Sequence, residues 1–309
     1  MKYVLLVLTV IALAAVPAVA SVPDDLQKVS VTIKAGDAQG SGTLVTRKVG
    51  DETVSFVWTA AHVVEGLRTT RTVVTAGGNS RTLIEYKDAE IVQERQQNGR
   101  RVGEVKYDCK IVKVSDADYG EDLALLMVRC KGAYPLSISA KFVKDPNYLP
   151  PIGVELSHCG SLLGQFGANS YTTGVLSQTG RTLAMKGANV KVFDQVTAVA
   201  FPGSSGGGMF LKANGEYIGM LTQGVMKLQG FNFIVPVRRI HAFAKAAKIE
   251  WAIDPQAKLP TRAEIEAMPV EDGGSPSGSF RDEPTPAAFK PSLNFDAVLG
   301  WVTRFFAGR

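Results

Sequence analysis

The stretch AFPGSSGGGMF, from Ala200 to Phe210, contains two adjacent serines among four glycines. So much glycine indicates either a flexible linker or a strained turn that exposes one hydroxyl. A hydrolase that attacks a carbonyl needs the turn, together with backbone N–H groups directed at the oxyanion that forms. The order Gly-Ser-Ser-Gly-Gly at 203–207 is typical of such a turn. It makes Ser205 the candidate nucleophile and the N–H groups of Gly203 and Ser205 the candidate oxyanion hole, although the motif alone does not exclude a linker.

A candidate general base lies upstream. His62 ends a strand-like apolar run and has small neighbours in the sequence WTAAHVV, residues 58–64. Its imidazole would take the Ser205 proton and later deliver it to the leaving amine. A histidine on an apolar face can equally be a buried structural residue. We adopt that interpretation for the other two histidines, His158 and His241.

A candidate acid lies between these two motifs. Asp122 comes directly before the apolar run LALL at 123–126. A carboxylate there would hold the imidazole tautomer and stabilise the imidazolium, unless it is only a turn residue. Asp116 and Asp118 are nearby alternatives, and Asp122 is preferred because it adjoins a buried strand.

The remaining pattern predicts an all-β fold. Many short β-branched runs are separated by turn residues, and the one credible helix runs from Pro236 to Ile249. Such a pattern favours a β-sandwich or barrel. The chain order histidine, aspartate, serine is that of the chymotrypsin-type triad. We therefore expect a chymotrypsin-like double six-stranded β-barrel with a C-terminal helix and a flexible tail.

Five motifs in order carry a family resemblance over about Val31 to Val237. The sequence resembles trypsin-like serine proteases of the chymotrypsin fold, closest to the HtrA/Deg branch. Ser204 stands where that branch usually has Asn or Asp, and Leu162-Leu163 stands where it often has Pro-Phe. We expect no PDZ domain after Val237. The motifs are GSGTLV (40–45), TAAHVV (59–64), DLALL (122–126), TGVLSQTGR (173–181) and NGEYIG (214–219).

The resemblance also implies where substrate would bind. The wall of the primary specificity pocket maps to positions that hold no acid, so cleavage after Lys or Arg is not favoured, and we expect an apolar, small to medium P1 residue. The edge strand 221–224 would pair with the substrate backbone. The mapped positions are Val199, Thr222, Gln223, Gly224 and Gly230.

The two ends of the chain differ from its centre. Residues 1–20 have a basic start, an apolar run and an A-x-A end, which predict a signal peptide cut near Ala20 and export to the periplasm or the medium. The alternative is a membrane anchor, for which the run is short. We expect a protease domain at 21–251, a Pro/Gly-rich linker at 252–294 and an amphipathic tail at 295–309. Thr261 and Glu264 form a capping-box pattern within the linker, which predicts a short helix there.

Charge and cysteines limit partners and cofactors. The formal net charge is +5, and basic residues are interleaved with acids, so we expect no nucleic-acid partner. No cluster has metal-ligand spacing and no phosphate loop is present, so we expect no metal and no cofactor. If strands 105–114 and 123–130 pair around Tyr119-Gly120, Cys109 faces Cys130 and a disulfide can form. Cys159 would then be a buried thiol.

Three functional hypotheses follow. The leading one is an exported serine endopeptidase acting on polypeptides. The second is a catalytically idle protease fold used as a binding or assembly module. The third is an envelope-associated structural protein that acts through the linker and the tail, which would dock on the body, on a partner or on a membrane surface. The sequence leaves the oligomeric state open.

Overall fold

The computed structural model describes residues 21–49, 52–74, 80–97, 100–130, 138–184, 190–224 and 230–271, and the statements below concern these residues. The predicted signal peptide (1–20), the predicted tail (295–309) and part of the predicted linker (272–294) lie outside them. Within the described ranges, no helix is both long enough and apolar enough to cross a membrane.

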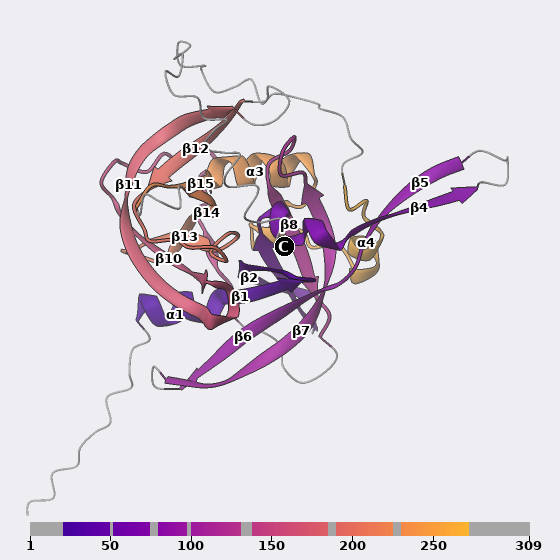
Figure 1. The fold of residues 1–309 in the computed structure, drawn as a ribbon, viewed down its shortest axis with the longest axis horizontal. Coiled ribbons are helices and arrows are strands. Elements are labelled where there is room, and N and C mark those ends of the chain that lie inside the picture. Colours follow the sequence, from indigo (N-terminus) through magenta and orange to yellow (C-terminus); the bar gives the residue numbers. More distant parts are fainter. Residues whose placement is uncertain are drawn as a thin grey trace, which may run out of the picture.

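The first half of the chain forms a closed barrel (Figure 1). Helix α1 (Val22–Val29) precedes it and is closed at its N-terminus by a capping box from Ser21. All six residues of β8 are buried, as expected for an uninterrupted apolar strand in a closed barrel. In spatial order the strands are β1 (Ser30–Ala35), β2 (Ala38–Val49), β3 (Glu52–Thr59), β8 (Leu123–Val128), β7 (Arg100–Ser115) and β6 (Ala89–Gln97).

The second half forms another ring of strands. Strand β13 pairs with both β10 and β14, which closes the ring, and β9 (Lys141–Phe142) adds to β14 in parallel. The predicted double six-stranded β-barrel is therefore confirmed. In spatial order the ring contains β13 (Gly208–Leu211), β10 (Glu155–Leu162), β11 (Gly167–Ala184), β12 (Val190–Val196), β15 (Asn232–Pro236) and β14 (Glu216–Gly224).

Aromatic side chains join the two barrels. Trp58 of the first barrel lies 6.4 Å from Phe142, which stacks 4.3 Å from Tyr217 of the second, as measured between ring centroids. All three residues are buried. Burial of such large rings stabilises the docking of the barrels, which positions anything built between them.

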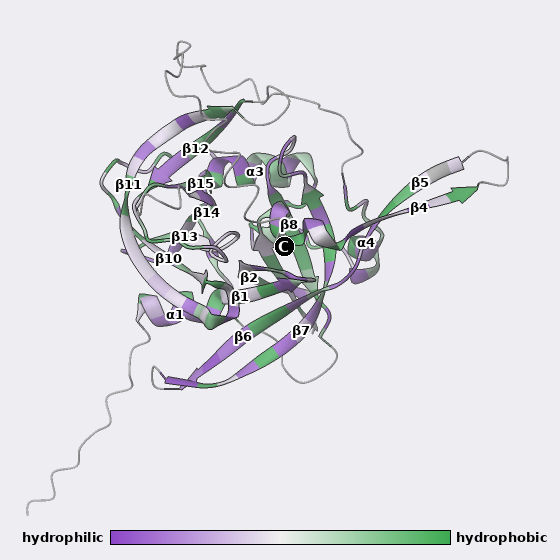
Figure 2. Ribbon diagram, viewed as in Figure 1, coloured by the Kyte–Doolittle hydropathy of each residue, from purple (hydrophilic) through white to green (hydrophobic). Residues whose placement is uncertain are grey.

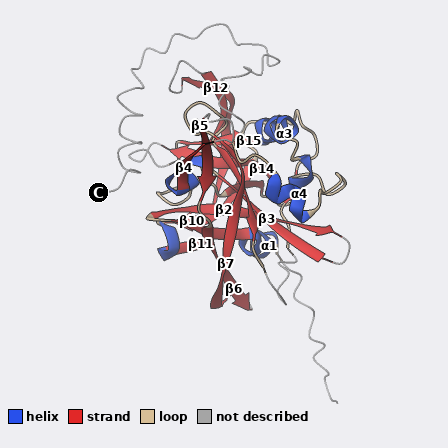
Figure 3. Cartoon of the chain, turned by 90° about the vertical axis from the view of Figure 1, so that its right-hand side faces the viewer, coloured by secondary structure: helices blue, strands red, loops and turns tan. Residues whose placement is uncertain are grey.

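Short helices lie outside the strands (Figure 3). The predicted late helix is confirmed as α3 (Val237–Ala246). The others are α2 (Ala61–Val64), η1 (Glu65–Leu67), η2 (Gly164–Phe166), η4 (Glu250–Ala252) and α4 (Arg262–Ala267).

Two hairpins extend from the first barrel. Strands β4 (Arg68–Val74) and β5 (Ser80–Tyr86) form a separate two-stranded sheet that projects from the body. Strands β6 and β7 continue past the barrel, and their free ends are hydrophilic, in contrast to the apolar β8 (Figure 2). The polar residues Gln97, Arg100 and Arg101 at this end are exposed to solvent.

The prediction of a linker starting at Ala252 is wrong for residues 252–271. The buried Arg47 guanidinium donates to the carbonyls of Trp251, Asp254, Pro255 and Ala257. Farther along, the N–H of Val114 donates to the carbonyl of Val270 (2.8 Å). The backbone carbonyls of this segment therefore bind a buried cation of the first barrel, and the segment packs along that barrel. The predicted helix within it is confirmed as α4, with the Thr261–Glu264 capping box in place.

The predicted disulfide is also wrong. Strands β7 and β8 place Ser115 opposite Leu123, one position off the predicted register, and a bulge between Ile111 and Lys113 shifts the pairing by one more. Cys109 therefore faces Val128 and not Cys130. Cys109 and Cys130 form no disulfide with each other. Cys159 is a buried free thiol, as predicted, and burial raises its pKa to about 12.

Candidate active site

The glycine-rich stretch is a strained turn and not a linker. Gly203 (φ +94°) and Gly206 (φ +87°) flank the two serines in left-handed conformations. A Cβ at Gly203 would lie 2.4 Å from the backbone nitrogen of Gly164, and one at Gly206 would lie 2.2 Å from the carbonyl oxygen of Ser41. Only glycine combines that backbone angle with such close approach. The turn therefore presents Ser205 at a fixed position.

Ser41 of the first barrel fastens this turn. Its N–H donates to the Ser205 carbonyl (2.8 Å), and its hydroxyl donates to the Gly203 carbonyl (2.7 Å). The same hydroxyl accepts from the N–H of Ser161 (2.7 Å). From the other side, the N–H of Gly206 donates to the Leu221 carbonyl (2.8 Å). Contacts from β2, β10 and β14 thus hold the nucleophile turn between the two barrels.

The predicted base and acid are in contact. Nδ1 of His62, on α2, lies 3.1 and 3.0 Å from the two carboxylate oxygens of Asp122, and the backbone N–H of His62 donates to Oδ1 (3.0 Å). Asp122 adopts a left-handed backbone (φ +55°) that aims its side chain back at the imidazole. Since an ionised carboxylate only accepts, Nδ1 carries the ring proton and Nε2 of the neutral ring holds the lone pair.

The two groups shift each other's pKa in opposite directions. Burial disfavours the charged imidazole, but the charge and hydrogen bond of Asp122, with a smaller effect of Glu65, outweigh burial and raise the pKa of His62. Burial likewise opposes ionisation of Asp122. The His62 charge and the hydrogen bonds from His62 and Thr222 nevertheless lower the pKa of that carboxyl. The arrangement therefore favours a charged pair when His62 accepts a proton.

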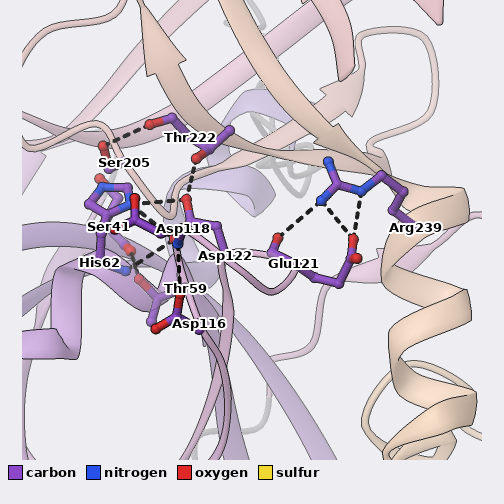
Figure 4. A network of polar contacts seen from close by, with 10 residues as sticks. All are labelled: Ser41, Thr59, His62, Asp116, Asp118, Glu121, Asp122, Ser205, Thr222 and Arg239. Atoms are coloured by element: carbon purple, nitrogen blue, oxygen red, sulfur yellow. Dashed lines mark hydrogen bonds and ion pairs between the residues drawn. The ribbon is translucent and has the colours of Figure 1, made fainter. Parts of the chain in front are cut away.

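Thr222 connects the acid to the nucleophile (Figure 4). Its hydroxyl donates to Oδ2 of Asp122, and its carbonyl accepts a long hydrogen bond of 3.4 Å from the Ser205 hydroxyl. The structure thus brings the three predicted residues together. His62 contacts Asp122 directly, and Thr222 contacts both Asp122 and Ser205. Figure 4 shows the contacts from Ser205 to Thr222 and from Thr222 to Asp122 as dashed lines.

Asp116, one of the alternative acids, has another role. The Asp116 carboxylate accepts from the backbone N–H groups of Asp118 (2.8 Å) and Tyr119 (2.7 Å), which makes it a turn residue. Asp122, the preferred acid, hydrogen-bonds to both the backbone N–H and Nδ1 of His62.

The candidate oxyanion hole has two N–H groups available. The Pro202 carbonyl accepts from the N–H of Leu163 (2.7 Å). In a trans peptide the carbonyl and the next N–H point in opposite directions, so the N–H of Gly203 is directed away from Leu163. In the described ranges neither this N–H nor that of Ser205 has a hydrogen-bond partner.

The other predicted site residues lie around β14 and the segment before the turn. The Val199 carbonyl accepts from the Thr172 hydroxyl (3.0 Å), Gly224 pairs with Asn232, and Gln223 pairs with Phe233. Gly230 (φ +77°) faces the backbone of Thr197. Residues 225–229, between two of these positions, lie outside the described ranges. The Thr222 hydroxyl is engaged by Asp122, a contact that the sequence analysis missed.

The two remaining histidines contact backbone carbonyls. Nδ1 of His158 lies 3.0 Å from the Gly208 carbonyl, and Nε2 of His241 lies 2.8 Å from that of Val143. Across the residues that the structure describes, no three or more His, Cys, Asp or Glu side chains gather as a metal site would require.

Comparison with known proteins gives structural matches only. A scan of protein-family models and a search of curated protein sequences gave no match. Among solved structures, the chain is similar to Deg5, with 21% identity, coverage of 75% of this chain and 94% of that chain, and a TM-score of 0.50. It is also similar to the inactive form of the Rv3671c protease of M. tuberculosis, with 16% identity, coverage of 74% and 92%, and a TM-score of 0.50.

A third similar structure is the MamO protease domain from Magnetospirillum magneticum, with 18% identity, coverage of 71% and 97%, and a TM-score of 0.49. At sequence identities this low, structural similarity shows a shared fold and not a shared function. The described part of the chain has the chymotrypsin-like double-barrel fold that the sequence motifs predicted, and it is similar in structure to Deg5 and the Rv3671c protease.

Proposed function

We propose that this protein is a serine endopeptidase that hydrolyses peptide bonds of polypeptides through Ser205, His62 and Asp122. The observation that carries the proposal is the set of contacts around one carboxylate. Asp122 accepts from His62 Nδ1 and from Thr222, and the Thr222 carbonyl accepts from Ser205. A strained turn, an oriented imidazole and a buried acid in one place are what acyl transfer to serine requires.

The first half-reaction would begin when Ser205 Oγ attacks the carbonyl carbon of the scissile peptide. Its proton moves to Nε2 of His62, and the imidazolium that forms is stabilised by Asp122. The carbonyl oxygen gains the negative charge and would accept from the N–H groups of Gly203 and Ser205. When the intermediate collapses, the C–N bond breaks, and His62 returns its proton to the leaving amine.

The second half-reaction would release the acyl group from the enzyme. A water molecule gives one proton to His62 as its oxygen attacks the ester carbonyl. The C–O bond to Ser205 then breaks, and the serine oxygen takes the proton back from His62. The products are a carboxylic acid and the unchanged enzyme, so this sequence of steps uses only water and the chain's own residues.

Two finer features of the function are also proposed. The candidate pocket positions Val199, Gly224 and Gly230 carry no acid, which supports an apolar, small to medium P1 residue. The basic and apolar pattern of residues 1–20 supports export, after cleavage near Ala20. Cleavage-site profiling on a peptide library tests the first feature, and N-terminal sequencing of the secreted protein tests the second.

The proposed chemistry is tested with a fluorophosphonate, which labels an activated serine covalently. Wild-type protein should be labelled and S205A should not. S204A is the matched control, because Ser204 is also buried in the same turn and its hydroxyl accepts from the N–H of Phe201 (3.1 Å). Labelling in S204A at the wild-type rate is expected. A folded wild type that takes no label would contradict the proposal and favour the idle binding or assembly module.

A further inference from the structure

Glu121, next to Asp122, has a carboxylate held between two cations. Its Oε1 lies 2.7 Å from Nζ of Lys191. Its Oε2 lies 2.7 Å from Nε and 2.6 Å from Nη2 of Arg239. The side chain is only 10% exposed. In Figure 4 it points away from the His62–Asp122 pair and toward α3.

Both cations belong to the second barrel and its helix. Lys191 lies on β12 and Arg239 on α3. Arg239 is itself fixed, because Nη1 donates to the Val192 carbonyl (3.0 Å) and the guanidinium carbon lies 4.8 Å from the ring centroid of Phe193. The Glu121 carboxylate therefore binds a rigid part of the second barrel, although its backbone belongs to the first.

The charges favour an ionised Glu121. Burial opposes ionisation, but Arg239 and Lys191 outweigh it and lower the pKa of the carboxyl. The contact is directional as well as electrostatic, because two nitrogens of Arg239 lie within hydrogen-bonding distance of one carboxylate oxygen.

The backbone around Asp122 needs such support. Asp122 has a left-handed φ of +55°, which a non-glycine residue keeps only when its surroundings hold it. Within the loop, the Glu121 N–H donates to Ser115 Oγ (2.7 Å) and the Asp122 N–H to the Asp116 carbonyl (3.2 Å). These hydrogen bonds stabilise the conformation of the loop, whereas the Glu121 carboxylate attaches the loop to the second barrel.

We propose that Glu121 is a positioning residue for the proposed reaction. Its ion pairs with Arg239 and Lys191 hold the β7–β8 loop against the second barrel, which carries Ser205. They thereby set the orientation of the Asp122 carboxylate toward His62. The inference rests on the proposed function for its catalytic consequence, and the geometry of the Asp122–His62 pair can be measured independently of activity.

Two substitutions test the charge and the length of the Glu121 side chain separately. E121Q removes the charge and keeps the length of the side chain. E121D keeps the charge and shortens the side chain by one methylene, so that it no longer spans the distance to both cations. The matched control is D194N. Asp194 forms a buried two-point ion pair with Arg238 (2.8 and 2.8 Å), which also joins β12 to α3.

The experiment measures two quantities for wild type and the three variants. One is the rate of fluorophosphonate labelling, with kcat and KM on a peptide substrate. The other is the pKa of His62, from an NMR titration of the imidazole, for which the charged groups acting on His62 are Asp122 and Glu65. A thermal melt reports the stability of each variant. A residue that only stabilises the fold would change the melt and leave the other two unchanged.

The expected result is a fall in labelling rate and kcat of roughly 10- to 100-fold in both Glu121 variants, with KM nearly unchanged, since small displacements of catalytic groups have effects of this size. The His62 pKa should fall in both, because Asp122 is less well oriented. D194N should match wild type in both quantities. Wild-type behaviour of E121D, or an equal effect of D194N, would overturn the proposal. If wild type takes no label, the proposed function fails, and the His62 titration alone decides the role of Glu121.

Discussion

His158 provides a prediction about acid stability. This side chain is fully buried in β10 beneath the nucleophile turn, where a Cβ at Gly207 would lie 2.5 Å from its Cε1. Nδ1 lies 3.0 Å from the Gly208 carbonyl and must donate to it. Nε2 has no hydrogen-bond partner among the residues that the structure describes. A proton added at Nε2 would therefore create a buried, uncompensated charge.

The size of the effect follows from the pKa of His158. Burial lowers it from 6.5 to about 4. Between these values the unfolded chain binds a proton that the folded protein does not, so stability is fully present above pH 6.5 and is lost as the pH falls. Each pH unit costs ~1.4 kcal/mol, and the whole interval of about 2.5 units costs ~3.5 kcal/mol. That is a large share of the free energy of unfolding of a typical native protein, which is about 5–15 kcal/mol.

The assay is urea unfolding between pH 7.5 and 4.5 in an S205A background, which prevents self-cleavage. The control variant is H158N, whose side-chain amide keeps a donor near the position of Nδ1 but does not titrate. His62 acts in the opposite sense: its raised pKa gives stability that is present below pH 6.5 and is lost as the pH rises. That contribution is common to both proteins and cancels in the difference.

The expected result is that the free energy of unfolding of the histidine form, relative to H158N, declines by ~1.4 kcal/mol per pH unit below about pH 6. A difference that stays constant down to pH 4.5 would refute the reasoning, because His158 would then take up its proton in the folded state without cost.

Four further predictions follow from the site and from the C-terminal segment. T222V removes the hydrogen bond to the charged Asp122, and phosphonate labelling should slow by roughly 10- to 100-fold; an unchanged rate would argue against the Thr222 contact. The labelling rate of the wild type should fall on acidification with a midpoint above pH 6.5, because the pKa of His62 is raised and only the neutral ring accepts a proton; a midpoint below 6.5 would contradict the Asp122 contact. G206A should abolish labelling, since the added Cβ would lie 2.2 Å from two oxygens, and full labelling would show that the turn is not fixed. R47M leaves the carbonyls of the 251–257 segment without their donor and should lower the free energy of unfolding by roughly 3 kcal/mol, as read from urea melts; wild-type stability would mean that this segment is held by other contacts.

The parts of the site that could be predicted from sequence are those with local requirements. A left-handed, crowded turn needs glycine at Gly203 and Gly206, so the pattern around Ser205 is visible in the sequence. The strands could be predicted for the same reason, because closed barrels require short apolar or β-branched runs. The chain order of the three candidate residues then favoured one double barrel among several all-β folds.

The contacts that were missed all join residues far apart in the chain. Thr222 and Asp122 are 100 positions apart, and Ser41 and Gly203 are 162 positions apart. No local pattern marks a threonine or a serine for such a contact. The wrong disulfide has a different cause, because the turn between β7 and β8 and the bulge in β7 each shift the pairing of Cys109 by one position. The wrong linker boundary arose because composition does not reveal that Arg47 binds the carbonyls of a polar segment.

These long-range contacts explain why a complete set of candidate catalytic residues does not by itself establish activity. His62 and Asp122 belong to the first barrel, and Ser205 belongs to the second. Their relative position depends on contacts across the boundary, among them Ser41 with Gly203, Thr222 with Asp122, and Glu121 with Arg239. Loss of any one would leave the sequence motifs intact and the geometry altered. An active protease and an idle binding module with this fold would therefore share the triad and differ first in these contacts. Substitutions at the contacts separate the two hypotheses more sharply than removal of the triad itself.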